Sequence, residues 1–241
     1  MTDPVDSLWD GLLGHVFPPR CVLCFRPGQP PTFDLCAACE AELPAPLDGG
    51  LRIEPPLPDD GRSATCDRWF AVCAYAPPVD AMIQALKYGG QLAIGRVLGR
   101  LLARGAADFG LQLDVDCVLP VPLHPHRHAG RGFNQSAEIA RYAARGLSLP
   151  VEPRLAVRLR ETRPQVGLAT AERRANLQDA FAGRPGLVRG RRIAIVDDVI
   201  TTGSTVAELA RALRQAGAAS VDVWCVARAT LDSGPRVSRA S

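Results

Sequence analysis

The segment at residues 193–205 constrains the fold of this 241-residue chain more than any other. Four apolar residues, IAIV, run into two neighbouring acids, Asp197 and Asp198. A loop of small hydroxyl residues around one glycine follows, and helical spacing begins at residue 204. A strand that passes through a short loop into a helix is typical of parallel α/β sheets, in which ligands bind at the carboxyl ends of the strands.

The same alternation of strand and helix extends over the body of the chain. Apolar runs predict strands at 69–75, 114–121, 191–198 and 220–228. Helical spacing predicts helices at 78–88, 92–104, 134–146 and 204–216, and Asn134 is a favoured residue to cap the third of these. Near-continuous apolar strands are buried on both faces. We therefore predict an α/β fold, a parallel sheet flanked by helices.

The loop after the two acids suits a sugar that carries a phosphate. Backbone N–H groups at a helix N-terminus attract a phosphate, and Gly203 lets the backbone approach it closely. Carboxylates accept hydrogen bonds from vicinal hydroxyls such as those of ribose. The segment lacks the GxxxxGK[ST] pattern of nucleoside triphosphate hydrolases, and the alternative is an ordinary capping turn. Further hydroxyl donors are Thr201, Thr202, Ser204 and Thr205.

Four of the eight cysteines form two closely spaced pairs, separated by 11 residues. The pairs are Cys21 with Cys24 and Cys36 with Cys39. Two such pairs can supply four thiolates to a tetrahedral zinc ion, and four thiolates leave no open position for catalysis. We therefore predict a structural zinc module. Disulfides are the alternative, which a reducing compartment disfavours.

The other four cysteines show no metal-ligand spacing. Cys73, Cys117 and Cys225 each lie within an apolar run, so we expect buried free thiols there. The role of Cys66 stays open.

Composition divides the chain into four parts. Residues 1–45 hold a predicted N-terminal helix and the zinc module, 46–66 a linker rich in Pro and Gly, 67–230 the α/β domain, and 231–241 a tail. The helix either packs on its own chain or binds a partner. No apolar run approaches the ~18 residues of a membrane-spanning helix, so membrane insertion is not expected. The acidic N-terminus is unlike a secretory signal, which predicts a cytoplasmic location.

Charge is unevenly distributed, although the net formal charge is only +3. Residues 1–70 hold 11 acidic and 5 basic side chains, whereas 154–192 hold 10 Arg and 3 acids. The Arg-dense segment favours an anionic ligand or surface, and solvated Arg side chains explain it equally well. Aromatic residues make up 5%, which leaves little for stacking on the bases of single-stranded DNA.

The sequence VDDVITTGST at 196–205 resembles the ribose 5-phosphate loop of type I phosphoribosyltransferases, which bind phosphoribosyl pyrophosphate (PRPP). The resemblance implies that Asp197 and Asp198 hold the ribose 2′ and 3′ hydroxyls. It also implies that the loop at 201–205 holds the 5′-phosphate.

Three further segments narrow this resemblance. They are ALKYG at 85–89, VLPVPLHPHR continuing to RGFNQ at 118–135, and TRPQVGL with ERRAN at 162–176. Behind a four-cysteine module, this order resembles the ComF competence-protein family over roughly residues 8–229. The resemblance implies a role in DNA uptake, with single-stranded DNA or a competence helicase as a partner. Many family members carry further cysteine pairs where this chain has only Cys66, so a second metal site is not expected.

The resemblance also assigns the diphosphate side of the site. Arg pairs bidentately with phosphate, and candidates for contact with the diphosphate are Lys87, Arg127, Arg131 and Arg163. Residues 161–176 would form the mobile loop that closes over the ligand and excludes water. From it Arg173 and Arg174 would reach the leaving group, as catalytic residues beside Asp197 and Asp198. Mg²⁺ would neutralise leaving-group charge. A solvated Lys87 or Arg127, and a sensor without turnover, are the alternatives.

Overall fold

The computed structural model describes residues 20–28, 34–46, 49, 51–52, 66–124, 132–160 and 177–229. It divides into two compact units, Met1–Leu43 and Pro44–Ser241, and each is described by itself. The predicted N-terminal helix and most of the predicted linker lie outside the described residues.

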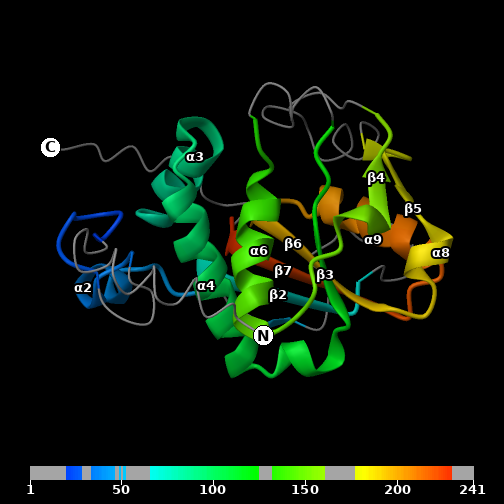
Figure 1. Ribbon diagram of the computed structural model, residues 1–241, viewed down its shortest axis with the longest axis horizontal. Helices are drawn as coiled ribbons and strands as arrows, with labels where there is room; N and C mark the ends of the chain where they lie inside the picture. Colours follow the sequence, from blue (N-terminus) through cyan, green and yellow to red (C-terminus); the bar gives the residue numbers. More distant parts are fainter. Residues whose placement is uncertain are drawn as a thin grey trace, which may run out of the picture. The chain divides into compact units, whose positions relative to one another are not determined.

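The second unit is built on a five-stranded sheet in the order β1-β2-β7-β6-β3 (Figure 1). Strands β2, β7, β6 and β3 are parallel, and β1 is antiparallel to β2 at one edge. The parallel sheet predicted from the apolar runs is confirmed. The strands are Leu51–Arg52 (β1), Arg68–Ala74 (β2), Cys117–Pro120 (β3), Arg192–Ile200 (β6) and Ser220–Arg228 (β7).

Helices cover both faces of this sheet, as Figure 1 shows. Ile193 and Ile195 of β6 lie in one apolar cluster with Leu209 and Leu213 of α9, because alternate residues of a strand share a face. Helices α4 and α6 contact the other face of the sheet, and α3 packs on α4. The four predicted helices are confirmed, within a few residues, as Val79–Gly89 (α3), Leu92–Asp108 (α4), Gln135–Leu147 (α6) and Ser204–Gln215 (α9).

Close packing between α4 and α6 sets the distance between the two helices. A Cβ atom at Gly99 would lie 2.6 Å from the carbonyl oxygen of Ile139 and 2.7 Å from Tyr142 Cβ. The two helix backbones therefore approach closely, as only glycine allows at that position. This contact helps to hold the N-terminus of α6 near the carboxyl ends of β3 and β6.

Several short elements have no counterpart among the predicted ones. Strands Ala156–Arg158 (β4) and Phe181–Gly183 (β5) form an antiparallel pair that packs on α9, and Pro185–Val188 forms α8. Elements of three or four residues are too short to show a hydrophobic period. The predicted strand at 114–121 is shorter than expected, because Leu111–Asp114 forms a 3-10 helix ahead of it.

The first unit holds the two cysteine pairs around a short helix, Ala37–Ala41 (α2). Cys36 is the N-cap residue of α2, and a turn in which the Phe25 N–H donates to the Cys21 carbonyl shapes the first pair. Outside this unit, the predicted burial of Cys73, Cys117 and Cys225 is confirmed, and Cys66 is buried too. No helix among the described residues is long and apolar enough to cross a membrane.

Candidate functional site

The loop between β6 and α9 surrounds a hollow at the carboxyl end of β6. The hollow holds about 260 Å³ of empty space, part of it open to solvent. Gly203, with φ at +75°, turns the chain into α9, and the hydroxyls of Thr202 and Ser204 share a hydrogen bond of 2.9 Å. All five predicted loop residues line this hollow, which is formed by Asp197, Val199, Ile200, Thr201, Thr202, Gly203, Ser204, Thr205 and Val206.

The first turn of α9 presents backbone N–H groups and the positive end of the helix dipole to the hollow. The Ala207 N–H donates to the Gly203 carbonyl at 2.9 Å, which starts the helical hydrogen bonds. N–H groups ahead of that point have no partner within a helix, and the helix dipole adds to their attraction for anions. The first turn of α9 carries no acidic side chain. The hollow is therefore suited to a phosphate group.

Asp197 forms the wall of the hollow on the strand side. Its Oδ1 accepts hydrogen bonds from Ser136 Oγ at 2.9 Å and from the Asp198 backbone N–H at 3.0 Å. Burial raises the pKa of Asp197 to about 7, and the neighbouring Asp198 charge adds to the rise. Lys87 and Ser136 oppose this shift without cancelling it. The folded chain thus holds an acid that changes charge near neutral pH.

Replacing Asp197 by Asn is expected to stabilise the protein above neutral pH. A carboxyl with a raised folded pKa binds an extra proton in the folded state between about pH 4 and 7. The wild-type free energy of unfolding therefore falls as pH rises through that window and stays low above it. Asn cannot ionise, so Asp197→Asn should be more stable at pH 8 by on the order of 2–4 kcal/mol, and about equal at pH 4. Urea unfolding across this range measures the difference, and parallel profiles would contradict it.

Asp198, the next residue, lies in different surroundings. Its side chain is only 3% exposed, and its Oδ2 lies 2.7 Å from Lys87 Nζ. Its Oδ1 accepts the Val199 backbone N–H at 2.8 Å. The Asp198 carboxylate raises the pKa of the Lys87 ammonium even though burial acts in the opposite direction. Lys87, from the last turn of α3, is thus a charged partner of the acid pair.

The four cysteines of the first unit converge. The sulfur atoms of Cys21, Cys24, Cys36 and Cys39 all lie within 4.8 Å of one another, and the Cys24 and Cys36 sulfurs are 3.6 Å apart. Ligands of a tetrahedral zinc–thiolate site, at ~2.3 Å from the metal, lie ~3.8 Å apart. No disulfide joins any of the eight cysteines, all of which lie in the described part of the chain. The cluster could bind zinc, as the spacing predicts.

The structure does not test several predicted residues. The Arg side chains expected on the diphosphate side and in the closing loop lie outside the described residues, and their roles stay predictions. They are Arg127, Arg131, Arg163, Arg173 and Arg174.

The N-terminus of α6 contributes a residue that the sequence did not single out. Ser136, 1% exposed, donates to Asp197, and Asn134 caps the helix as predicted by accepting from the Ser136 and Ala137 N–H groups. The Asn134 side chain also donates to the Val121 carbonyl at 3.0 Å. A buried serine in the first turn of a helix has no sequence signature, because its partner lies 61 residues away.

The sheet and its β6–α9 loop define the class of this domain. The family described as "phosphoribosyl transferase domain" matches residues 135–237, which contain the loop, both acids and α9. The chain therefore carries a domain of the type I phosphoribosyltransferase fold, joined to a four-cysteine unit. Among solved structures, the glutamine PRPP amidotransferase of Bacillus subtilis is 27% identical with a TM-score of 0.38. The match covers 54% of this chain and a quarter (25%) of that one.

Relatives that match most of the chain identify its family more specifically. DNA utilization protein YhgH of Escherichia coli O157:H7 is 38% identical over 226 residues, covering 88% of this chain and 97% of the relative. Competence protein F of Haemophilus influenzae is 35% identical over 207 residues, covering 82% of this chain and 86% of the relative. The chain belongs to the ComF family of these proteins, which confirms the resemblance seen in its motifs.

Proposed function

We propose that the protein binds PRPP with Mg²⁺ and transfers its phosphoribosyl group to a nitrogen acceptor. The hollow between β6 and α9 carries this proposal. It combines a helix N-terminus and hydroxyl groups for the 5′-phosphate with a carboxylate, Asp197, for the ribose. Lys87, held by Asp198, adds a positive charge for the diphosphate.

Mg²⁺ belongs to the ligand in this proposal. Among the described residues, the only group of three or more His, Cys, Asp or Glu side chains close enough to share one ion is that of the four cysteines. The described site therefore supplies no separate cage of oxygen ligands, and the ion would be held by the diphosphate and hydroxyl oxygens of PRPP. When bound, it would neutralise charge on the leaving group.

In the proposed reaction the acceptor nitrogen attacks the anomeric carbon. The bond from that carbon to the diphosphate oxygen breaks, diphosphate leaves with the electron pair, and the acceptor loses its proton to solvent. The residues of the chain act by holding the phosphate, orienting the ribose and stabilising charge, so no covalent intermediate is needed. The acceptor would be identified by its chemistry, a nucleophilic nitrogen.

Calorimetry tests the binding step first. PRPP with Mg²⁺ should bind the wild type with a measurable heat, and Thr201→Val/Thr202→Val should weaken binding at least about tenfold by removing two hydroxyl donors. Diphosphate release across a panel of nitrogen bases then separates an enzyme from a sensor. Binding without release on any acceptor would favour the sensor, and no binding at all would overturn the proposal.

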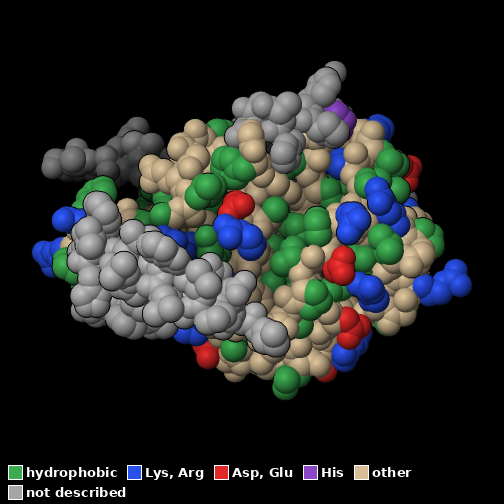
Figure 2. All heavy atoms as spheres, in the orientation of Figure 1, with side chains coloured by type: hydrophobic (Ala, Val, Ile, Leu, Met, Phe, Trp, Pro, Cys, Tyr) green, Lys and Arg blue, Asp and Glu red, His purple; other side chains and the backbone are tan. Residues whose placement is uncertain are grey.

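A second candidate function is contact with single-stranded DNA. The curated relatives are named for DNA utilization and competence. Figure 2 shows blue Lys and Arg side chains over β4, β5 and α8. The exposed Arg residues that the structure describes in the Arg-dense segment 154–192 are Arg154, Arg160, Arg184, Arg189 and Arg192. Affinity for a DNA oligomer that falls steeply with salt would support this function. Retention of that affinity in Arg154→Gln/Arg184→Gln would exclude this surface.

We also propose that the cysteine cluster holds a structural zinc ion and that the protein works in the cytoplasm, where thiols stay reduced. Metal analysis should find about one zinc per chain. Cys36→Ser should lose it, because three thiolates bind zinc more weakly. Cys73→Ala, which removes a buried thiol of the sheet, is the matched control and should keep the metal. Zinc at equal content in both variants would contradict the assignment.

A further inference from the structure

Asp197 and Asp198 are neighbours in sequence but do not share one environment. Successive side chains of a strand point to opposite faces of the sheet. Accordingly, Asp197 lines the hollow, whereas Asp198 is 3% exposed and does not line it. The expectation that both carboxylates hold ribose hydroxyls treats them as equivalent, and their surroundings differ.

Both oxygens of Asp198 are engaged. Oδ1 accepts the Val199 backbone N–H at 2.8 Å. Oδ2 is inaccessible to solvent and lies 2.7 Å from Lys87 Nζ. A ribose hydroxyl needs an accessible acceptor oxygen. Asp198 is only 3% exposed, and a hydroxyl could reach its Oδ2 only by displacing the Lys87 ammonium from a buried ion pair, which is costly.

Asp197 offers such an oxygen. Among the described residues, the two hydrogen bonds to Asp197, from Ser136 Oγ and the Asp198 N–H, both fall on Oδ1. Asn134 holds Ser136 in place: its side chain accepts the Ser136 N–H and donates to the Val121 carbonyl just after β3. The carboxylate is therefore braced through one oxygen, which leaves the other for a ligand in the hollow.

Lys87 is placed to act on an anion. Its side chain is 22% exposed, and Asp198, the neighbour of Asp197 on β6, holds its ammonium at 2.7 Å. An ammonium has three donors, of which the ion pair occupies one. A lysine held in this way meets a ligand without losing side-chain entropy at the moment of binding.

We propose that the two carboxylates have different functions: Asp197 accepts a ribose hydroxyl, and Asp198 is a positioning residue that holds Lys87 as a fixed positive charge for the diphosphate. This division rests on the proposed PRPP binding and refines it. It predicts that Asp198 acts only on ligands that carry the diphosphate, and only through Lys87.

Two probes separate the functions: ribose 5-phosphate, which lacks the diphosphate, and PRPP with Mg²⁺. Asp197→Asn should weaken the binding of both probes about tenfold or more. Asp198→Asn and Lys87→Met should each weaken PRPP about tenfold and change the affinity for ribose 5-phosphate less than about twofold. The double variant Lys87→Met/Asp198→Asn should lose no more PRPP affinity than Lys87→Met alone, because residues that act as a unit are not additive.

Each other outcome has a definite meaning. Loss of ribose 5-phosphate affinity in Asp198→Asn, equal to that in Asp197→Asn, would overturn the division of functions, and so would additive losses in the double variant. If a single variant fails to fold, the double variant, which removes both charges together, decides by the same two probes. Failure of the wild type to bind either probe would instead overturn the proposed function.

Discussion

Replacing Gly203 by Ala is expected to weaken the binding of ribose 5-phosphate on the order of tenfold. Gly203 stands at φ +75° as the N-cap residue of α9, in the middle of the loop that lines the hollow. A Cβ atom disfavours this backbone conformation, so the loop must shift and its N–H groups leave the phosphate. The loss of affinity cannot exceed the free energy needed to restore the strained loop, about 1–2 kcal/mol, which corresponds to roughly tenfold. Calorimetry with ribose 5-phosphate measures it.

Gly190 provides the matched control for that variant. It also has a positive φ, at +74°, and a Cβ atom there would meet nothing within 4 Å. Gly190→Ala therefore imposes the same backbone strain of about 1–2 kcal/mol in the turn ahead of β6, away from the hollow. Both variants should lose thermal stability by similar amounts, and only Gly203→Ala should lose the ligand. Equal loss of binding in the two would mean that strain, and not the loop, explains the effect.

The sequence predicted the hollow because all its parts are close together in the chain. The strand, the acids, the glycine and the helix start lie within residues 193–206, so local rules place them without knowledge of the rest of the fold. The contacts of the two acids with other elements could not be predicted in the same way. Lys87 on α3 contacts Asp198, which lies 111 residues later in the chain, and Ser136 on α6 contacts Asp197, which lies 61 residues later. Only the packing of α3 and α6 brings these side chains to the acids.

The sheet was equally accessible to prediction, since its strands are apolar over most of their length. β7 is buried at seven consecutive positions and β6 at most of its positions, which is the pattern of a strand covered on both faces. Strand order is a different matter. The pairing of β2 with β7 joins residues about 150 positions apart, and no local period contains that information. The β4–β5 pair was missed because three residues carry no usable period.

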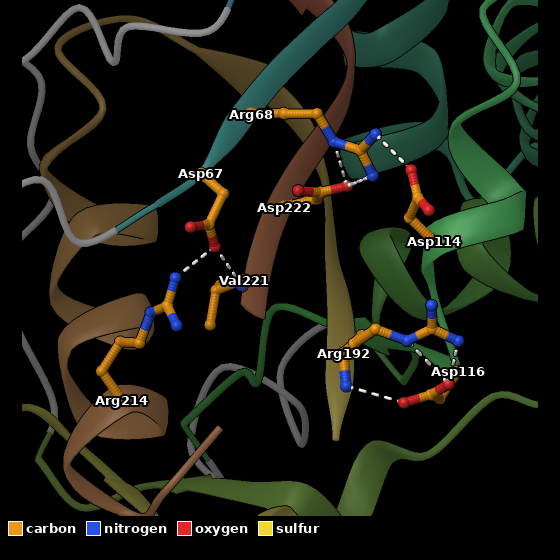
Figure 3. A network of polar contacts seen from close by, with 8 residues as sticks. All are labelled: Asp67, Arg68, Asp114, Asp116, Arg192, Arg214, Val221 and Asp222. Atoms are coloured by element: carbon orange, nitrogen blue, oxygen red, sulfur yellow. Dashed lines mark hydrogen bonds and ion pairs between the residues drawn. The ribbon is translucent and has the colours of Figure 1, made fainter. Parts of the chain in front are cut away.

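The amino end of the sheet, opposite the hollow, is held by ion pairs (Figure 3). Arg68 of β2 lies opposite Asp222 of β7 and donates to its Oδ2 through Nε at 3.0 Å and Nη2 at 2.6 Å. Arg192 of β6 pairs with Asp116 ahead of β3 at 2.7 Å. The two pairs share a chemistry and differ in burial, since Asp222 is 2% exposed and Asp116 is 38% exposed.

This difference makes Arg68→Met the most destabilising of the charge changes considered. Burial raises the pKa of Asp222, and the hydrogen bond and charge of Arg68 oppose this rise without cancelling it. Without Arg68 a buried charge stays uncompensated, and the free energy of unfolding should fall by about 3 kcal/mol, the lower end of the range for broken buried pairs. The loss should shrink as pH falls, because protonation of Asp222 removes the charge. Urea unfolding at pH 5 and pH 8 measures both effects.

Two further variants decide whether the burial of Asp222 causes that loss. Arg192→Met breaks an exposed pair, and exposed pairs contribute little, so its unfolding curve should nearly overlay the wild type. Arg68→Met/Asp222→Leu removes both charges and should recover most of the stability, because apolar side chains can replace a buried ion pair without net cost. If the double variant stays as unstable as Arg68→Met, the packing of the Arg68 side chain and not the charge of Asp222 sets the stability of this edge.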